Sequence, residues 1–333
     1  MKQLLAILLI LPLAAQVPLK PVTRAEVKFP TVDNQFYQIE LKEGEGWKKV
    51  GEAFKGNGEA MTRSVPKLDG NYRLQPVKDE WVLVWSDEFE GKSIDFTKWA
   101  HEENGYGGGN NERQYYSAAP KYSYVKDGWL HLSAYRDPHT TSDGKTQPYT
   151  SARLRTMNRG DWKYGRFVIS AKVPGAEGIW PAIWMLPTNS KWGGWAAGGE
   201  IDILESRGNE VDKTIGTLHF GGKWPKNTYK GTSYTLPGKN AAEAFHEYAI
   251  EWEKDEIRWY LDGKKYQTIK KEDWWSSAAK DNKTAPFDQP FHLIINLAVD
   301  GHFFGGTDQK SDRVPDSAFP QTLLVDYVRV YQR

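Results

Sequence analysis

From Trp81 to the C-terminus, the sequence repeats short strand-like segments bounded by turn signals, and in one of them, 128–135, apolar and polar residues alternate. This alternation is typical of strands that are buried on one face. The segments lie at 81–85, 128–135, 165–173, 291–299 and 323–331, and 248–261 has the pattern of a β-hairpin. Helical periodicity is limited to Asn240–His246 and Lys271–Ala279. Many short strands with few helices between them predict an all-β fold, either a sandwich or a jelly roll of two antiparallel sheets.

One of the predicted strands, Gly198–Glu205, carries three carboxylates in six residues. Side chains alternate between the faces of a strand, so Glu200 and Asp202 point the same way. Glu205 would point the opposite way unless a β-bulge near Ile203 and Leu204 adds one residue. With that bulge, three acids share one surface, where their mutual repulsion raises at least one pKa. Paired carboxylates of this kind are what a retaining glycosidase requires.

Two other interpretations of the acidic strand remain open. The acids can be the solvated face of an edge strand, or they can hold a divalent cation through their oxygens. The chain also contains 15 Trp, 17 Tyr and 13 Phe, which is more aromatic area than a core requires. Trp offers a flat apolar face with a polar edge, which suits stacking on pyranose rings. This surplus favours a sugar cleft, although many of these residues are also expected in the core.

Charge and cysteine content exclude several classes of protein. The formal net charge is +1 and no basic block is present, so we expect neither a nucleic-acid partner nor an anionic membrane partner. There is no cysteine, which excludes disulfides and thiolate metal sites. Such a chain depends on its core for stability, with an oxygen-ligated cation as the remaining type of cross-link.

The chain is expected to have four parts. Residues 1–15 have the basic start, apolar centre and small residues of a secretory signal peptide, so the protein is expected outside the cytoplasm. Residues 16–28, with Pro18 and Pro21, are expected to be a linker. Residues 29–76 are predicted to form a small β-rich module or extension, and residues 81–333 the main domain.

The ordered motifs of residues 81–333 resemble glycoside hydrolase family 16, and within it the laminarinase-like endo-β-1,3-glucanases. The motifs that carry the resemblance are Trp85–Phe89, Gly108–Glu112, Thr150–Arg153, Lys163–Phe167, Gly178–Leu186, Gly199–Glu205, Gly216–Gly222 and Val325–Tyr331. The resemblance implies a concanavalin-like β-jelly roll of two curved antiparallel sheets, with a polysaccharide bound in the concave face. It also implies a secreted, monomeric enzyme that hydrolyses β-1,3-glucan and needs no cofactor for catalysis.

The resemblance assigns roles to the acidic strand. It implies that Glu200 is the nucleophile, that Glu205 is the general acid and base, and that Asp202 tunes the nucleophile between them. Retention requires carboxyl groups about 5–5.5 Å apart. Along a flat strand the two Glu positions would be ~13 Å apart, so their side chains must lean together on a curved sheet.

The resemblance also implies substrate and metal ligands. It places Trp180 and Trp184 at sugar subsites, Asn110 and Arg153 near the glycone side, and His219 near the leaving group. A salt bridge is the alternative for Arg153, and a core position is the alternative for both Trp residues. A structural Ca²⁺ is implied at Glu88, Asp326 and the carbonyl of Gly128, with a salt bridge as the alternative for Asp326.

One departure from the family pattern follows the segment 296–299. The chain has Asp300–Gly306 where relatives often have a Trp-containing stretch, so Phe303 or Phe304 is expected to replace the stacking of that Trp.

Two other functions stay open. One is retaining hydrolysis of another polysaccharide, such as an agar- or carrageenan-type galactan, and the other is glucan binding without catalysis.

Overall fold

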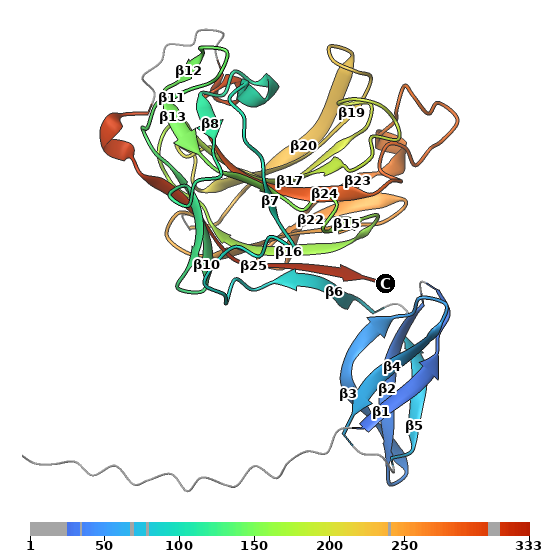
Figure 1. Cartoon of the computed structure of the whole chain (residues 1–333). Helices are drawn as coiled ribbons and strands as arrows, with labels where there is room; N and C mark the ends of the chain where they lie inside the picture. Colours follow the sequence, from blue (N-terminus) through green and yellow to red (C-terminus); the bar gives the residue numbers. More distant parts are fainter. Residues whose placement is uncertain (1–24, 34, 67–69, 78–79, 239–240, 306–313) are drawn as a thin grey trace, which may run out of the picture. The chain divides into compact units, whose positions relative to one another are not determined.

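The computed structural model describes residues 25–33, 35–66, 70–77, 80–238, 241–305 and 314–333. The chain divides into two compact units, residues 1–78 and 79–333. Figure 1 shows both units with their strands labelled. The predicted signal peptide and the first part of the predicted linker lie outside the described residues. Among the described residues, no helix is long and apolar enough to cross a membrane.

The first unit is formed by five antiparallel strands. They are β1 (Ala25–Pro30) with β4 (Ala60–Val65), and β3 (Gly46–Lys55), β2 (Phe36–Glu43) and β5 (Tyr72–Val77) in that order. Phe29, Ile39 and Val65 form its small core. The predicted linker was drawn too long, because residues 25–28 belong to β1 and pair with β4. Val27, within the predicted linker, packs against this core together with Phe29.

The second unit consists mainly of two eight-stranded antiparallel sheets, as the sequence predicts for a jelly roll. One sheet has the order β23-β22-β21-β16-β25-β10-β9, with β6 also paired to β25. Its strands are β6 (Val82–Asp87), β9 (Ser123–Lys126), β10 (Trp129–Ala134), β16 (Gly165–Lys172), β21 (His246–Trp252), β22 (Glu256–Leu261), β23 (Lys264–Lys270) and β25 (Gln321–Gln332).

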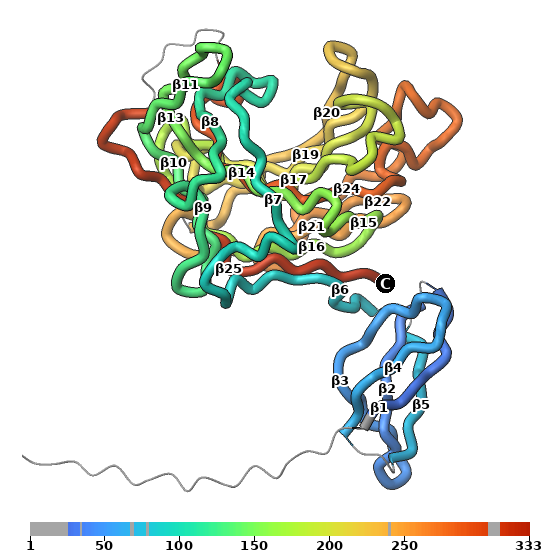
Figure 2. Tube along the Cα trace, viewed as in Figure 1, coloured from blue at the N-terminus to red at the C-terminus, as the bar shows by residue number. Residues whose placement is uncertain are grey.

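The other sheet has the order β20-β19-β18-β17-β24-β14-β7, with β15 also paired to β24. Its strands are β7 (Ala100–His101), β14 (Arg153–Arg155), β15 (Asp161–Trp162), β17 (Ile179–Pro187), β18 (Glu200–Glu205), β19 (Lys213–Gly221), β20 (Asn227–Thr235) and β24 (Phe291–Val299). Figure 2 shows the segment with β8 (Gln114–Tyr116), β11 (His139–Thr140) and β13 (Tyr149–Ser151) rising on one side of β17 and β24, and β20 rising on the other.

Apolar and aromatic side chains fill the space between the two sheets. Every residue of β24 is buried, and the strand is apolar apart from His292 and Asn296. Trp252 from one sheet packs edge-on against Phe291 from the other, with ring centroids 5.2 Å apart. Trp252 and Trp259 are fully buried, so part of the aromatic surplus serves the core.

The two helical predictions were wrong. Residues 241–245 form turns that lead into β21, and residue 240 lies outside the described part of the chain. Lys271–Asp273 is a single 3-10 turn, and an irregular segment follows it. Both segments are short, so tertiary contacts rather than intrinsic propensity decide their conformation. The predicted hairpin at 248–261 is confirmed by the pairing of β21 with β22.

Candidate active site

The β-bulge predicted in the acidic strand is present in β18. On the β17 side, Ile183 pairs with Leu204 and Trp184 pairs with Asp202, so Ile203 is the extra residue. The register on the β19 side shifts between the same positions, Asp202 and Glu205. Ile201, Ile203 and Leu204 are all buried in the core between the sheets. The bulge therefore returns Glu205 to the face that carries Glu200 and Asp202.

The opposite sheet supports this bulge. Trp259 of β22 is fully buried and donates its indole N–H to the Asp202 carbonyl, at 2.8 Å. The indole passes Gly216 of β19, where a Cβ atom would lie 2.5 Å from Trp259 Cδ1. Glycine at 216 thus makes room for the ring, and the ring satisfies a carbonyl of the irregular strand.

Each of the two glutamates accepts a hydrogen bond from a different tryptophan. Trp195 Nε1 donates to Glu200 Oε2 at 2.9 Å, and Trp180 Nε1 donates to Glu205 Oε1 at 3.1 Å. Asp202 is 3 % exposed, and its Oδ2 atom accepts no hydrogen bond from the described residues. The two glutamates are therefore held in place, while Asp202 keeps an unused oxygen.

His219 lies beside two of the acids. It pairs with Glu200 across β18 and β19. Its Nε2 atom is 3.4 Å from Asp202 Oδ2 and 3.7 Å from Glu200 Oε1. A protonated His219 would favour ionisation of both acids, which is consistent with its predicted place in the site.

Burial and mutual repulsion change the acidity of all three groups. Burial, followed by the Asp202 charge, raises the pKa of Glu200 to about 8. The same two causes, in the same order, raise the pKa of Glu205 to about 8. Burial holds the pKa of Asp202 well above its ordinary value. The three carboxyls cannot all be ionised near neutral pH, so they titrate as a coupled set. Such a set can supply one ionised and one protonated carboxyl at the same pH.

Among the described residues, one cluster has a geometry that could hold the divalent cation considered above. Glu200, Asp202 and His219 each offer one ligand atom, and these atoms lie within 4.8 Å of one another. Two carboxylates and an imidazole are an acceptable donor set for a transition metal. The same atoms belong to the acidic strand, so cation binding and glycoside chemistry compete for one location.

The two predicted sugar-stacking tryptophans have different environments. Trp180 is 8 % exposed and stacks on Phe303, with ring centroids 4.2 Å apart and planes 11° apart. Its main contact with the site is therefore the hydrogen bond that its indole N–H donates to Glu205. Trp184 is partly exposed, and its Nε1 donates to Asn296 Oδ1 at 2.7 Å. Arg153 covers this ring at 4.8 Å from the centroid.

Arg153 and Asn110 belong to a polar network beside Trp184. Arg153 is 7 % exposed and its Nε lies 3.3 Å from Glu102 Oε2, so the salt bridge considered for it exists. Asn110 Nδ2 donates to Glu112 Oε1 at 3.4 Å, and the Asn110 carbonyl accepts the His302 N–H. Both residues therefore lie on the β14 side of the acidic strand with structural partners of their own.

The three predicted calcium ligands meet at one edge of β25. The first half of this edge pairs with β10 and the second half with β6, and residues 326–327 lie at the junction. Gly128 immediately precedes β10, and Glu88 immediately follows β6. Glu88 accepts two hydrogen bonds from Arg329, and Asp326 Oδ2 accepts one from Ser170. The donor oxygens fit a hard cation, but Glu88 already has a cationic partner.

Trp195 is the residue that sequence reasoning missed. Trp195 belongs to the loop 191–197, which is rich in Trp and Gly, and its contact with Glu200 was not predicted. Gly199 has φ +88° and a Cβ there would lie 2.9 Å from Pro286, so only glycine permits the turn that folds the loop back. The sequence Trp-Ala-Ala-Gly-Gly-Glu at 195–200, which places two glycines between Trp195 and Glu200, was the feature from which this contact could have been predicted.

Comparisons with known proteins agree with this geometry. A model of glycosyl hydrolases family 16 matches residues 110–320. Glucan endo-1,3-beta-glucosidase A1 of Niallia circulans is 42% identical over 262 residues, which span 75% of this chain and 38% of that protein. The beta-glucanase of Rhodothermus marinus is 42% identical over 257 residues, which span 76% of this chain and 85% of that protein. The solved laminarinase structure from the same organism is 40% identical, with a TM-score of 0.64, and the match covers 76% of this chain and 98% of that one.

Proposed function

The chain belongs to glycosyl hydrolase family 16, and from this premise we propose that it is a retaining endo-β-1,3-glucanase that uses Glu200 and Glu205. The observation that carries the proposal is the bulged β18, which brings three buried carboxyls to one face. The two relatives named above, a glucan endo-1,3-beta-glucosidase and a beta-glucanase, support β-1,3-glucan as the substrate. Mixed-linkage β-1,3-1,4-glucan is a further substrate under this proposal. Members of the family need no cofactor for catalysis.

The proposed reaction has two displacement steps. In the first, the Glu200 carboxylate attacks the anomeric carbon and Glu205 gives its proton to the departing glycosidic oxygen, as the carbon–oxygen bond breaks. In the second, Glu205 takes a proton from water, the water oxygen bonds to the anomeric carbon, and the ester to Glu200 breaks. Two inversions give net retention.

The surroundings of the acids suit these roles. A pKa of about 8 keeps Glu205 protonated at neutral pH, as a proton donor must be. The pKa of Glu200 is also about 8, even with the lowering effects of His219 and the Trp195 N–H. The ionised Glu200 that attacks carbon therefore arises within the coupled set, when Glu205 and Asp202 hold their protons. A protonated Asp202 removes one of the negative charges that would oppose this ionisation.

The proposal is tested by comparing wild-type protein with Glu200→Gln on a panel of polysaccharides, with product size as the measurement. We expect the wild type to shorten laminarin and the variant to be inactive. Cleavage of agar or carrageenan without cleavage of any β-1,3-glucan would establish the galactanase alternative. Binding of laminarin with equal, background turnover in both proteins would establish glucan binding without catalysis.

Secretion and calcium binding are separate proposals. Secretion is supported by the pattern of residues 1–15 and is tested by locating the protein in cell fractions.

Structural calcium is supported by the positions of Glu88, Gly128 and Asp326 beside the same edge of β25. Its test is Tm with Ca²⁺ and with a chelator, for wild type and Asp326→Asn. We expect chelation to lower Tm for wild type alone, and equal Tm in all four samples would refute it. We also propose that the protein acts as a monomer, which sedimentation can check.

A further inference from the structure

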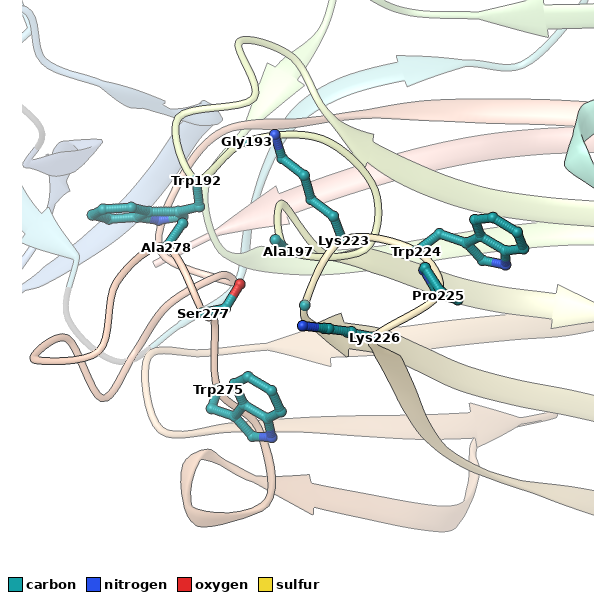
Figure 3. Close-up of a pocket in the computed structure, with 11 residues that line it drawn as sticks. Trp192, Gly193, Ala197, Lys223, Trp224, Pro225, Lys226, Trp275, Ser277 and Ala278 are labelled. Atoms are coloured by element: carbon teal, nitrogen blue, oxygen red, sulfur yellow. The ribbon is translucent and has the colours of Figure 1, made fainter.

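A hollow lies next to the acidic strand, at the end where Glu200 is located. It has a volume of about 540 Å³ and is lined in part by Trp192, Trp224 and Trp275. Figure 3 shows Trp192, Ser277 and Ala278 on one side and Trp224 with Pro225 on the other, with Lys226 between them. Trp224 is 73% exposed and Trp275 is 50% exposed. Large aromatic faces that remain this exposed are available to a ligand.

The hollow is connected to the acidic strand through the backbone. The Trp224 N–H donates to the Trp195 carbonyl at 3.3 Å, and the Trp195 indole N–H donates to Glu200. The lining residues Gly222–Lys226 form the turn between β19 and β20. In the sheet order, β18 separates this turn from β14, the strand of Arg153. A chain crossing the sheet from the Arg153 side would reach the hollow after passing the carboxyls.

The charge of the hollow is positive. Lys223 and Lys226 line it, and neither forms an ion pair in the part of the chain that the structure describes. No lining residue is acidic. The neighbouring carboxylate of Asp288 already accepts hydrogen bonds from Trp192 Nε1, at 2.6 Å, and from Asn282. Two free ammonium groups beside aromatic faces suit a ligand that has both an apolar ring face and an anionic group.

We propose that this hollow is a leaving-group-side subsite for a sugar that carries an anionic substituent, either a sulfate ester or a carboxylate. The proposal rests on the proposed function, because it assumes that a polysaccharide crosses β18. The sugar ring stacks on Trp224 or Trp275, and Lys223 and Lys226 bind its anionic group. A neutral glucan would use the same aromatic faces without the contribution of the lysines.

The test measures binding to the full chain carrying Glu205→Gln, which removes proton donation at the end of β18 distant from the hollow. Calorimetry compares neutral, sulfated and carboxymethylated β-1,3-gluco-oligosaccharides of equal length. We expect both anionic ligands to bind more tightly than the neutral one. Lys223→Ala with Lys226→Ala should weaken anionic binding about threefold to twentyfold and leave neutral binding unchanged. Added salt should have the same effect by screening.

A matched control removes two exposed lysines that do not line the hollow, Lys92 and Lys254. We expect this pair of changes to leave the preference intact. Tighter binding of only one anionic ligand would identify that substituent as the one recognised. The proposal is overturned if no anionic ligand binds more tightly than the neutral one, or if both lysine pairs have equal effects. Wild-type turnover of neutral laminarin, measured in parallel, tests the proposed function separately.

Discussion

At the scale of single residues, Glu200 and Glu205 each accept a hydrogen bond from one indole N–H, whereas Asp202 Oδ2 accepts none within the part of the chain that the structure describes. Glu200→Ala and Glu205→Ala should both abolish polymer hydrolysis, but they should differ in rescue. Azide should restore activity to the Glu200 variant and give a glycosyl azide of inverted configuration, because azide replaces the nucleophile from the opposite face. The Glu205 variant should lose least on substrates with good leaving groups, which need little proton donation. Product NMR identifies the glycosyl azide. If azide instead rescued the Glu205 variant with inversion, Glu205 would be the nucleophile and Glu200 the acid and base.

We expect Asp202 to influence catalysis through Glu200. Asp202→Asn keeps the size of the side chain and removes its charge and its exchangeable acid proton. We expect turnover to fall by about 10²-fold, less than for Glu200→Ala, because positioned proton and charge effects have this magnitude. The pH–rate profile should also shift, since the carboxyls titrate together. Unchanged turnover with an unchanged profile would make Asp202 a merely structural residue of the strand.

The raised pKa values of the carboxyls also affect stability. The folded chain keeps a proton on Glu205 up to about pH 8, while the unfolded chain releases it near 4.5. Wild-type stability should therefore fall as pH rises from about 4.5 to 8, by at most about 1.4 kcal/mol per pH unit for each proton held. Glu205→Gln removes this dependence, so its Tm relative to wild type should increase across that window. The exposed Glu90 offers a control, and Glu90→Gln should show no such trend.

At the scale of elements, the bulge of β18 depends on a residue of the opposite sheet. Gly216→Ala would place a methyl group 2.5 Å from Trp259 Cδ1, so the indole must move away from the Asp202 carbonyl. We expect a loss of about 1–3 kcal/mol in the free energy of unfolding and a lower kcat. Gly91→Ala serves as control, because its new Cβ would meet nothing closer than 3.5 Å. Equal stability and activity of both variants would show that Trp259 does not support the bulge.

The sequence predicted the bulge as the condition under which the three acids share one face of the strand, but it could not predict which residues stabilise the bulge. Trp259 comes from another sheet, 57 residues away, and its contact with Asp202 depends on how the two sheets pack. The Trp195 contact was missed for a similar reason, since it arises from the turn at Gly199. The covered face of Trp180 depends on Phe303, which the loop after β24 brings back to β17. The local sequence pattern predicts the strands and the face on which each side chain lies. The packing of the two sheets and their loops determines which side chains contact one another.

At the scale of the whole chain, residues 79–333 contain both sheets and every residue assigned to the site, and residues 1–78 form a unit of their own. The sequence pattern of 81–333, together with the family resemblance, was sufficient to predict two antiparallel sheets. It was insufficient for the limits of the smaller unit, because residues 25–28 pair with a strand that lies more than 30 residues later. Strand pairing at long range is not encoded in a local pattern.

The central claim is that Glu200 and Glu205 cleave β-1,3-glucan with retention. Proton NMR of the wild-type protein acting on a laminari-oligosaccharide shows which anomer of the new reducing end forms first. Two displacements at the anomeric carbon predict the β anomer first, followed by slow mutarotation to the equilibrium mixture. The α anomer as first product would mean a single displacement by water and would contradict Glu200 as the nucleophile.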